Sequence, residues 1–592
     1  MCGIVGYNGN EKCVANILYG LKQLEYRGYD SSGIAYIKDN QTIIKKEEGK
    51  IEKLERNLNI EEDSNLGIGH TRWATHGKPS KTNSHPHRIG KVTIVHNGII
   101  ENYDSLKKEL SNYKFNSETD SEVVAALIDS LYEKEKNMIK VLNKLKDYLV
   151  GSYALGILVE GDDKLYTIRK DSPLIIGVSE NGNFIASDVP AILKFTNKYY
   201  LLSNDEYACL EKNKVTIYSN EQVIEKDICT FEGSLDSAMK NGYDHFMLKE
   251  IYEQPKVIMD TINDYLNYDK LESLLKGLEE YEAIDIVGCG SAYHAGLVGS
   301  KLISQYSNII VNTDIASEYR YSKHIYAKKH LVIVISQSGE TADTLAVLRN
   351  VKEKNIDTLA IVNVIGSSIA REAGKVIYTK AGPEISVATT KAYTCQVMML
   401  SLIALYLGLK NNALTLSVLE QYKSIDKYIL EALKDTEKLQ DIATIIHKKN
   451  DIFFLGRKID YVFCLEASLK LKEISYLHSE AYAAGELKHG TISLIEEQTP
   501  VISIITDDSI RLKTLSNIKE VCARGAESII ISNEDIADSD TYKKLILVPR
   551  THELLQPILV IIKCQLLAYY VAKLNGCDID KPKNLAKSVT VE

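Results

Sequence analysis

The sequence predicts an α+β domain followed by two α/β domains, each with a parallel sheet. Up to about residue 235 the chain mixes short strands and helices without the regular strand–helix alternation of a parallel sheet. From about residue 245, apolar strands end in glycines or polar turns and lead directly into helices, which is typical of parallel α/β sheets. A chain of 592 residues is long enough for three or four domains.

In the first region, apolar residues at helical spacing predict helices over 14–26 and 121–133. Runs rich in β-branched residues predict strands over 92–96 and 152–160, separated by glycine and asparagine turns. Helices and strands in this mixed order favour an α+β sandwich over residues 1–235.

The second region repeats one pattern. A polar, glycine-containing segment predicts a linker over 236–244. Strand–turn–helix patterns follow at 330–354 and again at 451–474, which suggests a diverged duplication. We therefore expect the domain boundaries 245–425 and 426–580, with an irregular tail over 581–592.

Composition excludes several classes of protein. Hydrophobic residues make up 45% and charged residues 26%, as in ordinary soluble proteins. The net charge of -9 argues against general nucleic-acid binding, although helix termini can still bind small anions. The ten cysteines include no Cys-x-x-Cys pair, so we expect neither a disulfide framework nor a metal site.

The apolar run 397–409 is too short to span a bilayer and predicts a buried helix. Without a recognisable signal peptide, we expect a cytoplasmic protein.

Cys2 is the first candidate catalytic residue. If Met1 is removed, Cys2 becomes the N-terminal residue and carries both a nucleophilic thiol and a free α-amine. An unperturbed α-amine titrates near 7.7–8, so it can accept the thiol proton. Taken alone, a cysteine at position 2 is more often incidental than catalytic.

Other segments point to catalysis. The segments "CGIVGY" (2–7), "LEYRGYDSSGIA" (24–35), "GHTRWATHG" (69–77), "VHNGIIENY" (95–103) and "SETDSEV" (117–123) together resemble the glutamine amidotransferases that use an N-terminal cysteine. This resemblance implies an N-terminal-nucleophile (αββα) glutaminase fold. It also implies roles: Cys2 as nucleophile, Arg72 for the substrate carboxylate, Asp120 for the substrate ammonium, and the Asn97 side chain with the Gly98 N–H as oxyanion hole.

Two further features lie in this region. The segment "SHPH" (84–87) could suggest metal ligands, but its two histidines have no acidic or cysteine partner nearby, so we interpret them as structural. The only tryptophan, Trp73, is either core packing or, on the resemblance, a gate for ammonia between two active sites. Both interpretations of Trp73 stay open at this point.

The segment "SQSGETADTL" (336–345) lies between a predicted strand and a predicted helix. Its hydroxyls and backbone N–H groups would meet at a helix N-terminus, which favours phosphate binding. The alternative is a plain serine N-cap in which Glu340 completes a capping box. Two serines and a glycine directly after a strand are more than a cap requires, so we favour a phosphate site.

The segments "GCGSAYHAG" (288–296), "SVATTKAYTCQ" (386–396) and "EASLKLKEISYLHSEAYAAGELKHG" (466–490) resemble sugar-isomerase domains. With the tail "NLAKSVTVE" (584–592), the whole chain resembles the glutamine–fructose-6-phosphate aminotransferase (isomerising) family. That resemblance implies conversion of fructose 6-phosphate and glutamine to glucosamine 6-phosphate and glutamate, without a cofactor and as a homodimer. It assigns ring opening to His489, an imine to Lys587 and proton transfer to Glu473. It assigns sugar-phosphate binding to Ser291, Ser336, Gln337, Ser338, Thr341, Thr389 and Lys470.

Some positions depart from the family pattern. Ala292 replaces a frequent serine and carries no hydroxyl, so no side-chain contact is assigned to it. Thr389 keeps the hydroxyl of a common serine, and Lys583 keeps charge but loses the guanidinium fork of a frequent arginine. Apart from the resemblance, Lys470 and Glu473 would be interpreted as a surface ion pair three residues apart.

Two rival functions remain to be tested. A phosphoribosyl-diphosphate amidotransferase would share the first domain, and "ISIITDDSIR" (502–511) superficially looks like its acidic ribose-binding motif. No glycine-rich turn follows Asp507 and Asp508, however. A sugar-phosphate sensor without turnover is a different class, and the retained Cys2 and Glu473 disfavour it. The resemblance further implies no inhibition by nucleotide sugars, because regulated members of the family carry extra sequence in the first domain and this chain is too compact for it.

Overall fold

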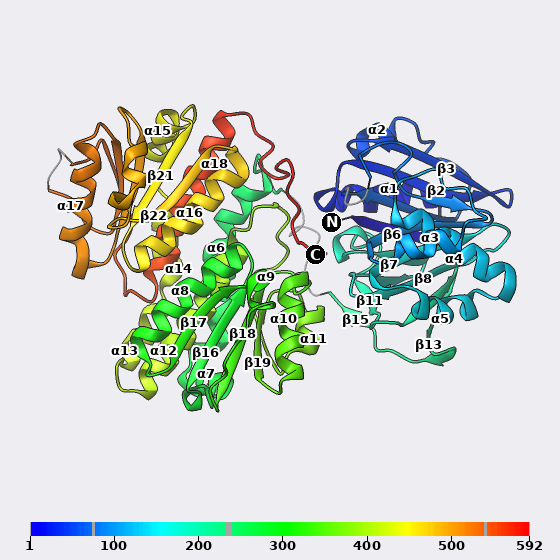
Figure 1. The fold of residues 1–592 in the computed structure, drawn as a ribbon, viewed down its shortest axis with the longest axis horizontal. Coiled ribbons are helices and arrows are strands. Elements are labelled where there is room, and N and C mark those ends of the chain that lie inside the picture. Colours follow the sequence, from blue (N-terminus) through cyan, green and yellow to red (C-terminus); the bar gives the residue numbers. More distant parts are fainter. Residues whose placement is uncertain (1, 74–76, 232–239, 538–540, 591–592) are drawn as a thin grey trace. The chain divides into compact units, whose positions relative to one another are not determined.

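The computed structural model describes residues 2–73, 77–231, 240–537 and 541–590. The chain forms two units (Figure 1). The first unit consists of Met1–Ala238 together with Ala586–Glu592, and the second consists of Met239–Leu585.

Two antiparallel sheets form the centre of the first unit. One has the strand order β15-β11-β9-β10-β1-β4-β2-β3, and the other has the order β14-β13-β12-β8-β7-β6-β5. The strands of the first sheet are β1 (Gly3–Gly9), β2 (Ser31–Lys38), β3 (Gln41–Glu48), β4 (Leu66–Arg72), β9 (Ile175–Ser179), β10 (Gly182–Ala186), β11 (Lys198–Leu201) and β15 (Cys229–Thr230). Those of the second are β5 (His87–Ile89), β6 (Val92–Ile100), β7 (Gly151–Val159), β8 (Leu165–Lys170), β12 (Tyr207–Glu211), β13 (Lys214–Ser219) and β14 (Gln222–Ile224).

Apolar residues from both sheets, among them Ile4, Ile68, Val95 and Leu165, form one buried core, so the two sheets pack face to face. The helices of this unit are α1 (Cys13–Gln23), α2 (Ile51–Glu55), α3 (Tyr103–Glu109), α4 (Asp120–Glu135) and α5 (Met138–Tyr148). A second core joins α3, α4 and α5 to the outer face of the sheet that contains β6. Helix α1 packs against β1 and β4. The layers are therefore helix, sheet, sheet and helix, as the sequence predicted.

The second unit contains two five-stranded parallel sheets, with strand orders β17-β16-β18-β19-β20 and β22-β21-β23-β24-β25. The strands of the first are β16 (Ala283–Gly288), β17 (Ile310–Ile315), β18 (His330–Ser336), β19 (Asp357–Val362) and β20 (Lys375–Tyr378). Those of the second are β21 (Asp451–Gly456), β22 (His478–Ala483), β23 (Pro500–Ile505), β24 (Glu527–Ser532) and β25 (Lys544–Leu547). This repetition agrees with the predicted duplication.

Helices cover both sheets, most of them contributing to one large apolar core and the others to smaller cores. They are α6 (Phe246–Ile262), α7 (Tyr268–Leu275), α8 (Ser291–Tyr306), α9 (Ala316–Tyr319), α10 (Ala342–Glu353), α11 (Ser368–Glu372), α12 (Lys391–Lys410), α13 (Leu416–Tyr422), α14 (Ile425–Ala432), α15 (Thr436–Ile446), α16 (Ile459–Ser475), α17 (Arg511–Cys522) and α18 (Gln556–Leu574). By length and composition alone α12 and α18 could cross a membrane, but both lie largely buried in this core. The buried helix predicted over 397–409 is thus the inner part of α12.

The predicted elements correspond to observed ones. The predicted strands over 92–96 and 152–160 are β6 and β7, and the helices over 14–26 and 121–133 are α1 and α4. The predicted linker lies partly outside the described residues. Between residues 581 and 590 the tail has no regular helix or strand, in agreement with its irregular sequence.

Candidate active sites

Cys2 directly precedes β1, whose neighbour β4 ends at Arg72. The register pairs Gly3 with Thr71, so one residue further along it places Cys2 opposite Arg72 and next to Trp73. The Trp73 backbone N–H donates to Cys2 Sγ at 3.2 Å. Burial raises the pKa of the Cys2 thiol, and the contact with Trp73 is among the effects that oppose this shift. Met1 lies outside the described residues.

Asn97 reaches Cys2 from the second sheet. It lies on β6, where its side chain points toward the first sheet. Its Nδ2 donates to the Cys2 carbonyl at 3.0 Å and to Ser187 Oγ at 2.8 Å. The predicted oxyanion donor is therefore next to the nucleophile, and both of its N–H groups contact protein oxygens. An oxyanion would have to share or replace one of these contacts.

Gly98 follows Asn97 and has a φ of +129°, which favours glycine. A Cβ at this position would lie 2.0 Å from the Ser152 carbonyl oxygen. Only glycine fits there, so the sequence requires it for backbone packing as well as for its proposed N–H contact.

Arg72 ends β4 and is buried. Its guanidinium donates to the Gly77 carbonyl at 3.2 Å. Burial lowers the pKa of Arg72, and the nearby Cys2 and Asp120 act in the opposite direction. The three predicted groups Cys2, Arg72 and Asp120 therefore lie within electrostatic reach of one another.

Asp120 is the first residue of α4. The helix begins here because Thr119 acts as N-cap and accepts from the Glu122 N–H at 3.3 Å. The Asp120 carboxylate accepts from the backbone N–H of Ile100 and of Ser121, each at 2.9 Å. These two bonds fix the orientation of the Asp120 carboxylate.

Trp73 is half-buried, and its ring packs edge-to-face against Tyr29 with centroids 5.9 Å apart. This contact fits both interpretations, core packing and gate. Residues 74–76 of the same motif lie outside the described residues.

The histidines of "SHPH" belong to a buried cluster behind Asn97. His85 stacks on His70 with ring centroids 4.1 Å apart and contacts His87 edge-to-face at 4.7 Å. His85 Nδ1 accepts from the His96 N–H at 3.2 Å, and His87 Nε2 lies 3.1 Å from Thr119 Oγ1. Burial lowers the pKa of His70 to about 3 and holds the pKa values of His85 and His87 well below their usual range. The rings are therefore neutral and serve as packing and hydrogen-bonding groups.

In the second unit, the turn after β18 brings two hydroxyl groups together at the start of α10. Thr341 is the N-cap of α10 and makes no side-chain capping bond. Ser336 Oγ lies 2.8 Å from Thr341 Oγ1 and accepts from the Gly339 N–H at 3.0 Å. Glu340 instead accepts from the Ser368 N–H at 2.8 Å, at the start of α11. The alternative of a serine N-cap with a Glu340 capping box is therefore wrong, because Glu340 caps a different helix.

A buried ionic cluster joins α8 to α16. Ser291 Oγ donates to Glu466 Oε1 at 2.9 Å, and His294 Nδ1 lies 2.7 Å from Glu466 Oε2. Lys470 Nζ lies 3.6 Å from Glu466 and 2.5 Å from Glu473. Burial acts to lower the pKa of Lys470, but the two carboxylates outweigh it and raise that pKa. Lys470 is 1% exposed. The interpretation of Lys470 and Glu473 as a surface pair is therefore wrong.

The other predicted sugar residues are more dispersed. Gln337 and Ser338 lie in the turn after β18, and Thr389 is half-buried just before α12. His489 is exposed in a short 3-10 turn after β22, and among the described residues its side chain makes no hydrogen bond or ion pair. Lys587 lies in the tail that groups with the first unit. The structure thus brings Ser291, Lys470 and Glu473 together around Glu466.

Comparisons with known proteins agree with both halves of this arrangement. A model described as "Glutamine amidotransferase domain" matches residues 70–194, and one described as "SIS domain" matches 278–406 and 445–574. The chain is 48% identical to the glutamine–fructose-6-phosphate aminotransferase (isomerising) of Clostridium acetobutylicum and 44% identical to that of Thermococcus kodakarensis, with full coverage of all chains. The chain belongs to the glutamine–fructose-6-phosphate aminotransferase (isomerising) family.

Solved structures add to this. The C-terminal domain of a glucosamine–fructose-6-phosphate aminotransferase from Francisella tularensis is 37% identical, with a TM-score of 0.54, over 58% of this chain and 99% of that one. A tagatose-6-phosphate ketose/aldose isomerase from Escherichia coli is 16% identical, with a TM-score of 0.50, over 57% of this chain and 96% of that one, and shares the fold.

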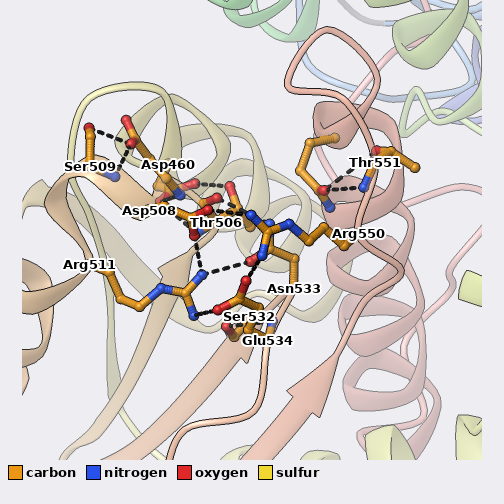
Figure 2. Close-up of polar contacts among 12 residues, drawn as sticks. Asp460, Thr506, Asp508, Ser509, Arg511, Ser532, Asn533, Glu534, Arg550 and Thr551 are labelled. Atoms are coloured by element: carbon orange, nitrogen blue, oxygen red, sulfur yellow. Dashed lines mark hydrogen bonds and ion pairs between the residues drawn. The ribbon is translucent and has the colours of Figure 1, made fainter.

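The second SIS domain contains a cavity at the carboxyl ends of its strands. The turns after β23, β24 and β25 surround this cavity, whose volume is about 510 Å³. Figure 2 shows that arginine–carboxylate pairs fill this edge. Arg511 pairs with Asp508 and lies 3.0 Å from Glu534, and Arg550 pairs with the same two carboxylates. Asp507 is 3.2 Å from Lys458. The acidic residues of "ITDDS" therefore contact the protein's own cations.

Sequence analysis did not single out Glu466, His294, Ser187 or His70. Glu466 lies four residues before Lys470, so helical spacing placed it on the same face as the predicted lysine. His70 lies two residues before Arg72 on β4, so strand alternation placed both side chains on one face. No sequence signal indicated Ser187, which meets Asn97 only through the pairing of β1 with β10.

Proposed function

We propose that this chain hydrolyses glutamine at Cys2 and uses the released ammonia to convert fructose 6-phosphate to glucosamine 6-phosphate. The observation that carries the proposal is the convergence on Cys2 of Asn97 from one sheet and Arg72 from the other. Membership of the family, whose curated relatives carry this reaction in their names, supports the same conclusion.

In the glutaminase unit, Cys2 Sγ attacks the side-chain amide carbon of glutamine. The Asn97 amide and the Gly98 N–H stabilise the tetrahedral oxyanion. The C–N bond then breaks and ammonia leaves, and water hydrolyses the thioester to release glutamate and restore the thiol. Arg72 binds the substrate carboxylate and Asp120 binds the substrate ammonium. With Met1 removed, the Cys2 α-amine acts as the base.

In the second unit, the turn Ser336–Thr341 binds the phosphate, with Gln337, Ser338 and Thr389 as further polar contacts. His489 opens the sugar ring, and Lys587 forms an imine with C2 of the open ketose. Ammonia from the first unit attacks this imine carbon, releases the Lys587 amine and leaves an imine of ammonia at C2, with Trp73 as candidate gate. Glu473 then moves a proton from C1 to C2, and the C1 hydroxyl proton passes to nitrogen, which gives the C1 aldehyde and the C2 amino group of the product. Ser291 and Lys470 support this site from the shared cluster with Glu466.

The proposal includes no cofactor and no metal ion, because imine and acid–base chemistry use only side chains of the chain. It places the enzyme in the cytoplasm as a homodimer, without nucleic-acid or membrane partners. The domains are 1–235, 245–425 and 426–580, joined by the linker 236–244 and followed by the catalytic tail 581–592.

The direct test measures glucosamine 6-phosphate in four reactions: with glutamine and fructose 6-phosphate together, with either one omitted, and with an ammonium salt in place of glutamine. We expect product only when fructose 6-phosphate and a nitrogen donor are both present. Glutamate release without any aminated sugar would contradict the proposal. The same assay with phosphoribosyl diphosphate tests the rival amidotransferase, which the arginine pairs of Asp508 disfavour. Turnover of any kind excludes a pure sensor.

A further inference from the structure

The amide of Asn97 is held at both ends by groups whose hydrogen-bonding roles are fixed. One end faces the Cys2 carbonyl oxygen at 3.0 Å. The other end lies 3.1 Å from His70 Nε2, which also lies 3.0 Å from the His96 carbonyl oxygen. Asn97 and His70 are both buried.

These contacts determine each donor. A carbonyl oxygen only accepts, so the end of Asn97 at Cys2 is Nδ2 and the end at His70 is Oδ1. The His96 carbonyl also only accepts, so His70 Nε2 carries a proton and donates to both oxygens. His70 is therefore the neutral tautomer protonated at Nε2. Burial lowers its pKa to about 3, which agrees with a neutral ring.

The ring of His70 is itself held in place. It stacks on His85 with an interplanar angle of 16° and centroids 4.1 Å apart. On the other side of Asn97, Ser187 Oγ accepts from Asn97 Nδ2 and from the Ile4 N–H, each at 2.8 Å. The amide therefore lies between a fixed donor from β4 and a hydroxyl that is tied to β1.

We propose that His70 is a positioning residue for glutamine cleavage, which holds the Asn97 amide so that Nδ2 and not Oδ1 faces Cys2. This inference rests on the proposed function. If the amide rotated by half a turn, Oδ1 would face both the Cys2 carbonyl and the developing oxyanion, and oxygen would repel oxygen. His70 prevents this, because its Nε2–H binds Oδ1 and would have no acceptor if Nδ2 took that place.

The test compares His70→Leu, which has no donor, with His70→Gln, whose amide nitrogen can still donate to Asn97. His87→Leu is the matched control, since His87 belongs to the same buried cluster but contacts Thr119 rather than Asn97. Three quantities are measured in the full-length enzyme: kcat and KM for glutamate release, the rate at which iodoacetamide alkylates Cys2, and synthesis driven by an ammonium salt.

For His70→Leu we expect kcat for glutamate release to fall about ten- to a hundredfold, less than the 10²–10³-fold loss of an oxyanion donor itself. KM for glutamine, alkylation of Cys2 and ammonium-driven synthesis should stay close to the parent values. His70→Gln should recover most of kcat, and His87→Leu should keep it.

Equal loss of kcat in His70→Leu and His87→Leu would overturn the proposal, because it would indicate damaged packing. The proposal would also fail if His70→Gln were as slow as His70→Leu while its alkylation rate was normal. Failure of the proposed function is recognised separately, since the parent enzyme would then release no glutamate at all.

Discussion

Ser291 on α8 and Lys470 on α16 bind the same buried carboxylate, Glu466, at 2.9 Å and 3.6 Å. The contact joins the two SIS domains, because α8 follows the first strand of one parallel sheet and α16 follows the first strand of the other. A charge buried at such a junction is stable only while its partners are present.

Glu466→Gln should therefore lower the unfolding free energy of the second unit by about 3 kcal/mol. This value is at the lower end of the range for breaking a buried ion pair, because Glu473 still compensates the charge of Lys470. Thermal unfolding and ammonium-driven synthesis measure the effect, and both should decline while glutamate release persists. The control is Glu420→Gln, which breaks an exposed pair with Lys423 and should change stability by less than about 1 kcal/mol. Equal effects of the two substitutions would refute the role of Glu466.

Gly98→Ala should abolish glutamate release. Its Cβ would meet the Ser152 carbonyl at 2.0 Å, so β6 and β7 would have to separate beside Cys2. Gly161→Ala is the control, because Gly161 also has a positive φ but open space around it, and should cost only about 1–3 kcal/mol of strain. Ammonium-driven synthesis by Gly98→Ala should survive. A variant with full glutaminase activity would show that the backbone at this position can move without cost.

Retention of Met1 should eliminate glutamine-dependent synthesis, since the Cys2 amine would then be part of a peptide bond. We expect a form with a short N-terminal extension to make product from an ammonium salt but not from glutamine. Intact-mass measurement verifies the N-terminus of each sample. Normal glutamine use by protein that still carries Met1 would exclude the amine as base. Cys2→Ala provides the reference for complete loss of glutaminase activity.

Lys587→Arg keeps the positive charge but cannot form an imine. Borohydride with fructose 6-phosphate should therefore trap an adduct on Lys587 in the parent and none in the variant, as located by peptide mass spectrometry. Lys583→Arg is a nearby control on the same tail and should still be trapped. Trapping on another lysine, or normal synthesis by Lys587→Arg, would overturn the assignment.

The first unit should lose stability as pH falls below about 6.5. His70, His85 and His87 have pKa values lowered by burial, so the unfolded chain binds protons at a pH where the folded chain does not. Each of these histidines should lower the free energy of unfolding by about 1.4 kcal/mol per pH unit as the pH falls from about 6 to 4. Trp73, the only tryptophan, reports this unit by fluorescence. His87→Leu should reduce the slope of unfolding free energy against pH by the contribution of one proton. An unchanged slope would contradict the assignment of His87 as a buried, neutral ring.

Much of the fold and of the glutaminase site could be predicted from sequence, because the information is local. Alternation along β6 and helical spacing along α4 and α16 depend on near neighbours, and the motifs around Cys2, Asn97 and Arg72 are contiguous. Long-range contacts could not be predicted this way. The bond from Ser291 to Glu466 joins residues 175 positions apart, and the contact of Asn97 with Ser187 joins residues 90 apart.

The same limit applies to the two alternative interpretations that the structure contradicts. Lys470 and Glu473 have the spacing of a surface pair, but only the packing of α8 against α16 shows that Lys470 is buried. Glu340 has the spacing of a capping box, but the turn after β19 brings α11 within its reach and provides a different N–H. In both cases sequence spacing correctly indicated which residues could interact, and tertiary structure decided which of them did.

The last residues of the chain group with the first unit, so the second unit is an insertion between two segments of the first. The chain passes from one unit to the other twice, once near residue 239 and once near residue 586. Cleavage near residue 239 divides the first unit between two polypeptides, because residues 586–592 stay covalently attached to the second unit. A fragment that ends at residue 238 lacks residues 586–592 of its own unit, so a faithful glutaminase fragment has to include both ends of the chain, as two co-expressed pieces or as one permuted polypeptide.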